Sequence, residues 1–272
     1  MRGCAGQLNG FAQTAMSKVR TTIAIVAAME REVKPLIRNW NFRAMEQGGR
    51  RYRIFEDGDT ALVCGGIGAA AARRATEAMI EEVKPERVLS VGFAGALDSS
   101  FRIGDIVEPG TVINAADGAR TEIISGNGIL VSSATVASTE QKVQLAKAYG
   151  ASAVDMEAAA VAQGAQARGI EFGAVKAISD GANFSLPALD GFVAEDGTFR
   201  SGRFALYVVL RPWLWGTTVA LARNSSKASE ALCAAIVSYL GREGRGERFA
   251  GVPTGVGAEA RTQDHTQAAT KQ

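Results

Sequence analysis

Three observations predict an α/β fold, a single domain in which helices flank a mixed, mostly parallel central sheet. Thr22–Ala28 is a continuous apolar run, which is typical of a strand covered on both faces, and Arg87–Gly92 is expected to be another buried strand. These runs alternate with segments of helical spacing, and that alternation favours a parallel sheet. The chain has 272 residues, enough to bury the core of one such domain.

The first half of the chain divides into short elements that are separated by turn residues and helix-ending residues. In order, they are an amphipathic helix through Val33, Leu36 and Ile37, strands Arg51–Glu56 and Thr60–Cys64, the glycine turn Gly65–Gly68, an alanine-rich helix to about Val83, and the strand from Arg87 into Leu97. Asp57-Gly58-Asp59 between two apolar runs is a hairpin signal, and Pro85 ends the alanine-rich helix.

The second half continues the alternation up to a polar stretch near Pro187. Its predicted elements are a strand from Gly104 through Ile113, a polar loop at Ala115–Gly128, the strand Ile129–Ser132, a helix capped by Ser138 or Thr139 and running to Tyr149, the helix Ala158–Arg168, the strand 171–179 and the helix Leu221–Leu240. We expect residues 1–20 to form a disordered extension, 21–240 the domain and 241–272 a disordered tail.

Composition limits the chemistry that the chain can perform. Lys and Arg number 30 against 28 Asp and Glu, so the net charge does not indicate a nucleic-acid-binding protein. Three scattered cysteines form neither a disulfide framework nor a metal motif, and the one histidine, His265, lies in the polar tail. We therefore predict no metal site, and acid–base chemistry must come from carboxylates, Lys, Tyr or Cys.

The apolar segment Phe204–Ala222 is long enough to span a membrane but has Arg211 and Pro212 at its centre, which argues against a transmembrane helix. The first twenty residues lack the apolar run of a signal peptide, so we expect a cytoplasmic protein.

Trp213 and Trp215 have two interpretations. They fill the core or a dimer interface, or they form an apolar mouth or a peripheral membrane contact.

A glycine motif and three acids are the candidates for function. Gly66–Ala71 fits a relaxed dinucleotide fingerprint, but it is not in the first βαβ unit and no acid ends the next strand. A milder interpretation is that its backbone amides approach a ligand or an anion. Glu32, Glu157 and Asp180 each follow a strand; if those strands are parallel, the acids share one edge of the sheet with the glycine turns. Any one of the three alone could instead be a cap or a turn residue.

Five short motifs carry a resemblance to a known family. They are Ala27–Val33 (AAMEREV), Gly66-Ile67-Gly68, Gly92-Phe93-Ala94-Gly95, Val154-Asp155-Met156-Glu157 and Ala177-Ile178-Ser179-Asp180. Their order and spacing over about Ile23–Asp180 resemble the purine nucleoside phosphorylase/nucleosidase superfamily, and look most like methylthioadenosine/S-adenosylhomocysteine nucleosidases. The part from Leu186 to Arg223 looks more like hopanoid-associated phosphorylases. The resemblance implies a nucleoside phosphorylase-like fold and a homodimer.

The resemblance also implies roles for individual residues. Asp180 would protonate the purine at N7, and Glu32 would deprotonate the attacking water. The implied substrate-binding residues are Glu157 and Met156 at the ribose, Ile67 and Phe93 near the 5′ substituent or nucleophile, Val136 and Ala137 at the base, and Gly68, Ala94, Gly95, Asp155 and Ser179 around them. Protonating the base assists departure from an oxocarbenium-like state.

The sequence departs from the family pattern in three places. Phe93 replaces a small hydroxyl residue, residues 132–136 (SSATV) replace a loop that normally ends in a base-stacking aromatic, and Asn183 stands where an acid is common. The lost stack is worth about 1–3 kcal/mol by analogy with nucleic-acid bases. The class of reaction is therefore better supported than the identity of the substrate.

Hydrolysis of a 5′-substituted adenosine is the leading hypothesis, because Glu32 favours water as the nucleophile. Phosphorolysis, with phosphate as co-substrate, stays open because Arg73 and Arg74 follow the glycine turn. Two further hypotheses are a lipid-linked substrate such as adenosyl hopane and a nucleoside-binding module without catalysis. We expect no cofactor besides phosphate, a small nucleoside as the binding partner and no nucleic acid.

Overall fold

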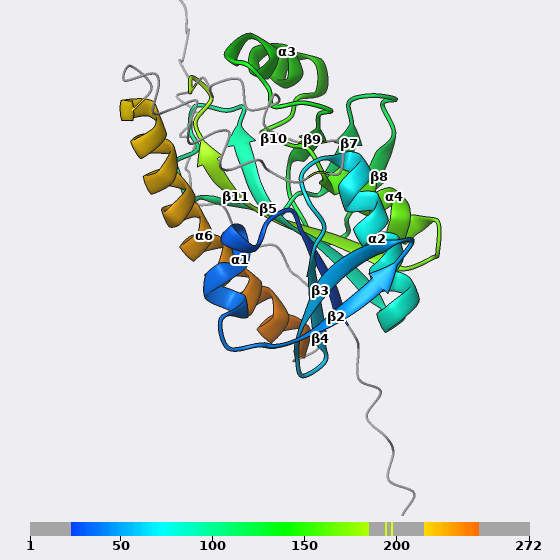
Figure 1. The fold of residues 1–272 in the computed structure, drawn as a ribbon. Helices are drawn as coiled ribbons and strands as arrows, with labels where there is room; N and C mark the ends of the chain where they lie inside the picture. The colour runs from blue at the N-terminus through cyan, green and yellow to red at the C-terminus, as the bar shows by residue number, and fades with distance from the viewer. Residues whose placement is uncertain (1–22, 185–193, 195–196, 198–214, 245–272) are drawn as a thin grey trace, which may run out of the picture.

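The central strand of the sheet, β5 (Arg87–Ala96), determines where a site can form. The computed structural model describes residues 23–184, 194, 197 and 215–244 (Figure 1). One edge of β5 pairs along most of its length with β11 (Glu171–Asp180) in parallel. On the other edge, residues 87–90 pair in parallel with β1 (Ile23–Ala27), whereas Gly95 and Ala96 pair antiparallel with β10 (Ala153–Asp155). On this second edge, residues 91–94 lie between the end of the β1 ladder and the start of the β10 ladder and pair with neither strand.

The remaining strands extend this mixed sheet on both sides. The order is β2-β3-β4-β1-β5-β10-β9-β7-β8, with β6 paired to β11. Their bounds are β2 (Asn41–Gln47), β3 (Arg50–Asp57), β4 (Thr60–Cys64), β6 (Ile106–Val107), β7 (Thr111–Asn114), β8 (Arg120–Glu122) and β9 (Ile129–Ser132). The ladders β1–β4, β1–β5, β5–β11, β9–β10 and β7–β9 are parallel.

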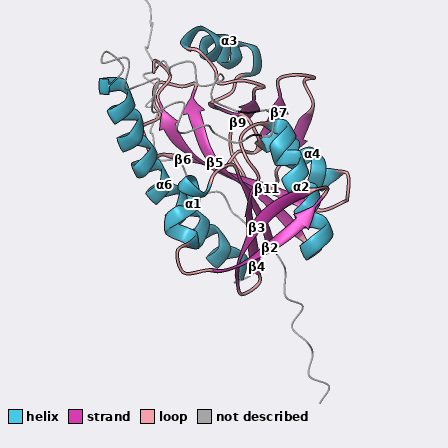
Figure 2. Ribbon diagram, in the orientation of Figure 1, coloured by secondary structure: helices cyan, strands magenta, loops and turns pink. Residues whose placement is uncertain are grey.

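Helices cover both faces of this sheet (Figure 2). On one face, α2 (Ala69–Val83) and α4 (Ala158–Gln166) pack together with small apolar residues, among them Ala75 and Ala162. On the other face, α1 (Glu30–Ile37) and α6 (Trp215–Gly244) pack together through Val33, Ala228 and Leu232. The structure confirms the predicted fold class, a mixed sheet between helical layers.

Helix α3 (Thr139–Tyr149) packs beside β9 and begins as its sequence predicts. The Ser138 hydroxyl accepts a hydrogen bond from the Gln141 amide at 3.3 Å, and the Gln141 side chain accepts one from the Ser138 amide at 2.8 Å. This reciprocal capping box satisfies two amides that the first helical turn leaves unpaired. The start of α3, and with it the position of Lys142, is therefore encoded locally.

Three details differ from the expectations. The edge strand β2 was not predicted, because only Met45 of its seven residues is buried and its apolar pattern is weak. The predicted loop at 115–128 contains β8, and the predicted strand from Gly104 to Ile113 is two strands, β6 and β7, with different neighbours. Pro109 and Gly110 lie between them, and a proline cannot donate to a ladder.

Several predictions fall on residues outside the described ranges. These are the extension at 1–20, Trp213, His265 and most of the tail from residue 241; the side chain of Trp215, the first residue of α6, is also outside them. Helix α6 runs to Gly244, past the predicted start of the tail. Among the described helices, none combines the length and apolar character needed to cross a membrane.

Candidate active site

Every predicted site residue except Gly68 lines one pocket of about 150 Å³. It lies where β5 separates from β1, at the carboxyl ends of β1 and β11 and the start of α4. Its walls are largely apolar, with contributions from Ile67, Phe93, Val136 and Met156, and its polar groups are mainly carboxylates. An apolar pocket with a few convergent polar groups is typical of a small-molecule site.

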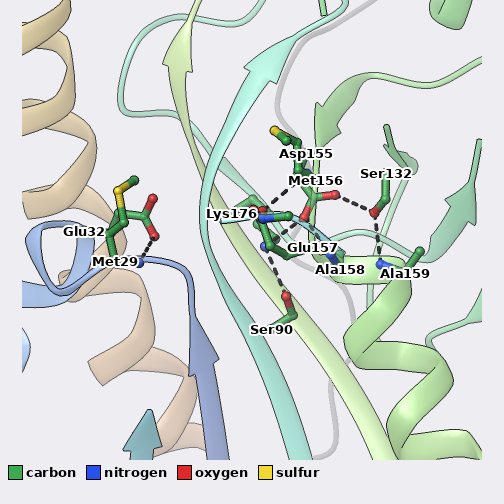
Figure 3. Close-up of polar contacts among 11 residues, drawn as sticks. Met29, Glu32, Ser90, Ser132, Asp155, Met156, Glu157, Ala158, Ala159 and Lys176 are labelled. Carbon is green, nitrogen blue, oxygen red and sulfur yellow. Dashed lines mark hydrogen bonds and ion pairs between the residues drawn. The ribbon is translucent and has the colours of Figure 1, made fainter. Parts of the chain in front are cut away.

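The carboxylate of Glu32 comes from the first turn of α1 and is only 3% exposed. It accepts a hydrogen bond from the Met29 amide at 3.4 Å (Figure 3). Gly92 of β5 has a φ of 148°, and a Cβ there would lie 3.1 Å from Glu32 Oε2, so glycine makes this close approach feasible. Burial, with added repulsion from Glu157, raises the pKa of Glu32 to about 7.

Glu157 lies immediately before α4 and has a fixed orientation. The Gly68 amide donates to its Oε1 at 2.8 Å, and the Met156 amide donates to its Oε2 at 3.3 Å. Burial, with repulsion from Asp155, raises the pKa of Glu157 to about 7. The anion that the amides of the glycine turn were expected to approach is thus the Glu157 carboxylate of the protein itself. Gly68 does not line the pocket but holds Glu157 in place.

A buried polar network holds Asp155, two residues before Glu157 (Figure 3). The Lys176 ammonium lies 2.9 Å from Asp155 Oδ2 and donates to Ser90 Oγ at 3.1 Å. Ser132 Oγ donates to Asp155 Oδ1 at 2.5 Å, and the Ala158 amide donates to Asp155 Oδ2 at 2.9 Å. Asp155 therefore anchors the start of α4 with oxygens that protein donors already occupy.

Asp180, the last residue of β11, is 4% exposed and has partners on both carboxylate oxygens. Ser179 Oγ donates to Oδ1 at 2.8 Å, and the Lys142 ammonium donates to Oδ2. A Cβ on Gly95 would lie 2.8 Å from Oδ2, so this close arrangement requires glycine at position 95. The pocket thus contains Asp180, which is paired with an ammonium at the end of β11, and separately the two glutamates Glu32 and Glu157.

The assumption that parallel strands bring the acids together was incomplete. Glu32 and Asp180 follow β1 and β11, which are both parallel to β5, as expected. Glu157 instead follows β10, which is antiparallel to β5. It reaches the same pocket because β10 pairs only with the far end of β5 and α4 begins next to the gap.

Sequence reasoning missed two buried lysines of the site, Lys142 and Lys176, and the serines Ser90 and Ser132. Lys176 did leave a signal, since a lysine inside a continuous apolar strand is seldom buried without an acidic partner. Lys142 left none, because its neighbours on α3 are mostly polar and exposed.

Arg73 and Arg74, the sequence-based candidates for a phosphate clamp, do not line the pocket, whereas Arg31 does. Across the part of the chain that the structure describes, no three His, Cys, Asp or Glu side chains are grouped as a metal site would need.

Comparison with known protein families shows which family this chain belongs to. Residues 22–134 and 123–205 match the model of the phosphorylase superfamily. The chain belongs to the phosphorylase superfamily. The 5′-methylthioadenosine/S-adenosylhomocysteine nucleosidase of Staphylococcus aureus is 28% identical over 199 residues, covering 59% of this chain and 87% of the relative.

Solved structures share the fold of this chain. The S-adenosylhomocysteine nucleosidase of Streptococcus pyogenes, in complex with 5-methylthiotubericidin, has a TM-score of 0.62 and 20% identity, covering 82% of this chain and 98% of that one. Futalosine hydrolase of Helicobacter pylori has a TM-score of 0.60 and 19% identity, with coverages of 82% and 98%. At these identities the structures show the fold alone. The superfamily match and the nucleosidase relative bear out the predicted class of protein, an enzyme of the nucleosidase and phosphorylase group.

Proposed function

We propose that this phosphorylase-superfamily member hydrolyses the N-glycosidic bond of a purine nucleoside, and that the nucleoside is a 5′-substituted adenosine. The observation that carries the proposal is the arrangement of acids in one pocket: Glu32 and Glu157, each with a pKa raised to about 7, and Asp180. A carboxyl group with a pKa near the working pH is suited to general acid–base catalysis. The nucleosidase relative from S. aureus supports the same reaction.

Each group has a chemical task in this reaction. As the bond between the sugar and the base breaks, its electron pair moves to the purine, and a proton delivered through Asp180 at N7 makes the base a better leaving group. Glu157 accepts hydrogen bonds from the ribose hydroxyls and stabilises positive charge on the sugar. Glu32 takes a proton from the attacking water, whose oxygen forms the new bond to the sugar carbon.

The charge of the pocket favours water over phosphate as the nucleophile. A phosphate anion beside Glu32 would face Glu157 as well, and like charges at close range repel. Arg31 is the one arginine among the described residues that line the pocket, and Phe93 offers no hydroxyl donor. These features support hydrolysis.

The experiment is base release from a panel of purine nucleosides, with and without phosphate. Hydrolysis predicts free base and free sugar at the same rate in both buffers; strict dependence on phosphate would sink it. An Asp180→Asn variant should lose about 10²–10⁴-fold in kcat. If this variant keeps the wild-type turnover, Asp180 does not carry the proton; if the wild-type protein binds nucleosides but releases no base, the chain is a binding module.

A second candidate is phosphorolysis or hydrolysis of an adenosine with a large apolar 5′ group, such as adenosyl hopane. A groove of about 420 Å³ between α1 and α6 shares Arg31 and Phe93 with the reaction pocket, so a long 5′ substituent could continue into it. Activity on the lipid-linked nucleoside with little on methylthioadenosine would favour this candidate. A cytoplasmic homodimer with a peripheral membrane contact near Trp213 and Trp215 is part of the same proposal.

A further inference from the structure

Lys142 is a buried lysine in the pocket wall that the mechanism above does not use. It is 2% exposed, although most of its neighbours on α3 are exposed. Its ammonium donates to Asp180 Oδ2, to the Gly181 carbonyl at 2.8 Å and to the Phe184 carbonyl at 3.4 Å. A buried ammonium is costly unless it is paired and hydrogen-bonded, and one short segment supplies all of these partners.

The contacts of Asp180 are those of an acceptor. A lysine ammonium has only donors to offer, so the carboxylate oxygen that meets Lys142 accepts. The second oxygen accepts from the Ser179 hydroxyl at 2.8 Å. In this arrangement both oxygens of Asp180 accept hydrogen bonds, and the Lys142 ammonium donates one of them.

The pair is also built into the backbone of β5. A Cβ at position 95 would lie 2.8 Å from Asp180 Oδ2 and 3.3 Å from Lys142 Cε, so Gly95 makes room for both side chains. Lys142 and Asp180 both line the reaction pocket. The ammonium is therefore placed at the site of base protonation rather than elsewhere in the core.

We propose that Lys142 acts through Asp180: it positions the carboxylate and supplies the proton that the leaving base receives. This inference rests on the proposed function. It would explain how a carboxylate whose two oxygens both accept hydrogen bonds can still deliver a proton to the base.

The proton balance closes over one turnover. As the glycosidic bond breaks, its electron pair goes to the purine; Lys142 passes one of its protons to Asp180, and Asp180 delivers that proton to N7. Lys142 ends as a neutral amine, Asp180 as a carboxylate and Glu32 as a carboxylic acid that holds the proton of the water. Solvent then takes the proton from Glu32 and returns one to Lys142.

Other ionisable groups contribute to the same field. Arg31, Glu32, Asp155 and Glu157 also line the pocket, and Lys176 pairs with Asp155 behind it. The test therefore compares variants at Lys142 with a variant that leaves all of these groups in place. Lys147, an exposed lysine on the same helix, supplies that control as Lys147→Met.

The experiment measures Lys142→Met, Lys142→Arg and Lys147→Met on two substrates. One is the purine nucleoside that the wild-type protein cleaves; the other is p-nitrophenyl β-D-ribofuranoside, whose nitrophenolate leaves without a proton. Lys142→Met should lower kcat on the nucleoside about 10²–10⁴-fold, with little change in KM, and should spare the nitrophenyl riboside. Lys142→Arg keeps the charge but does not release its proton, so it should stay slow on the nucleoside. Lys147→Met should match the wild type.

Two results would overturn the inference and leave the proposed function standing. One is an equal loss on both substrates in Lys142→Met, which would make Lys142 structural; the other is full recovery in Lys142→Arg, which would make it a counter-ion only. No base release by the wild-type protein would instead refute the proposed function. If Lys142→Met does not fold, or the riboside is not cleaved, the wild-type pH profile decides. The inference predicts that kcat holds from pH 7 to 9, whereas a lone carboxylic acid predicts a tenfold fall per pH unit.

Discussion

Replacing Glu32 by Gln should make the protein more stable at alkaline pH and inactive at every pH. Glu32 is almost fully buried, and burial together with repulsion from Glu157 raises its pKa from 4.5 to about 7. Glutamine has nearly the same shape, and its side-chain oxygen can still accept from the Met29 amide. The substitution therefore removes the charge and keeps the packing.

The size of the effect follows from the pKa. Between pH 4.5 and 7 the folded state binds more protons at Glu32 than the unfolded state, so the free energy of unfolding falls as pH rises. A shift from 4.5 to about 7, at 1.36 kcal/mol per unit, corresponds to about 3 kcal/mol lost above pH 7. Glu32→Gln should recover up to this amount at pH 8 and change little at pH 4.5.

The assay is urea denaturation of the wild type, Glu32→Gln and Glu77→Gln at pH 5 and pH 8. Glu77 is an exposed glutamate on α2, so its substitution should leave the free energy of unfolding nearly unchanged at both pH values. A Glu32→Gln variant that is no more stable than the wild type at pH 8, or that differs from it equally at both pH values, would refute the reasoning.

Three further predictions concern the same pocket. Hydrolysis needs both Glu32 and Glu157 ionised, so kcat/KM should rise at least tenfold per pH unit below about 7 and level off above it. Gly95→Ala should cost on the order of 100-fold in kcat, because its Cβ would displace the Asp180 carboxylate from a distance of 2.8 Å. Lys176→Met should cost about 3–5 kcal/mol of stability, because it leaves the buried Asp155 without its ion pair.

Matched controls separate these effects from general damage. Gly241→Ala, where the glycine has open space around it, should leave activity unchanged, and Lys147→Met should leave stability unchanged. A pH profile that is flat from pH 5 to 8, full activity in Gly95→Ala, or wild-type stability in Lys176→Met would each contradict the corresponding role.

Local patterns predicted the parts of this molecule that depend on neighbouring residues. The apolar run before Met29 predicted β1, and the Ser138 cap predicted the start of α3. The acids at the ends of β1 and β11 were expected to share one edge of the sheet if their strands were parallel, and both strands are parallel to β5. That geometry depends only on the alternation of strands and helices.

The parts that sequence reasoning missed depend on contacts between distant residues. The antiparallel pairing of β10 with β5 is set by tertiary packing, so no local pattern could predict it. Lys142 reaches Asp180 across 38 positions of the chain, and nothing in the polar surface of α3 distinguishes it from Lys147. Amphipathic spacing predicts which face of a helix is buried, but it does not identify an ion-pair partner.

The most direct test of the central claim is the release of free purine base in phosphate-free buffer by the wild type and by Asp180→Asn. Hydrolysis with Asp180 on the proton path predicts stoichiometric base and free sugar from the wild type, and a loss of about 10²–10⁴-fold in kcat for the variant. Absence of base release without phosphate, or equal turnover by the two proteins, would contradict the account.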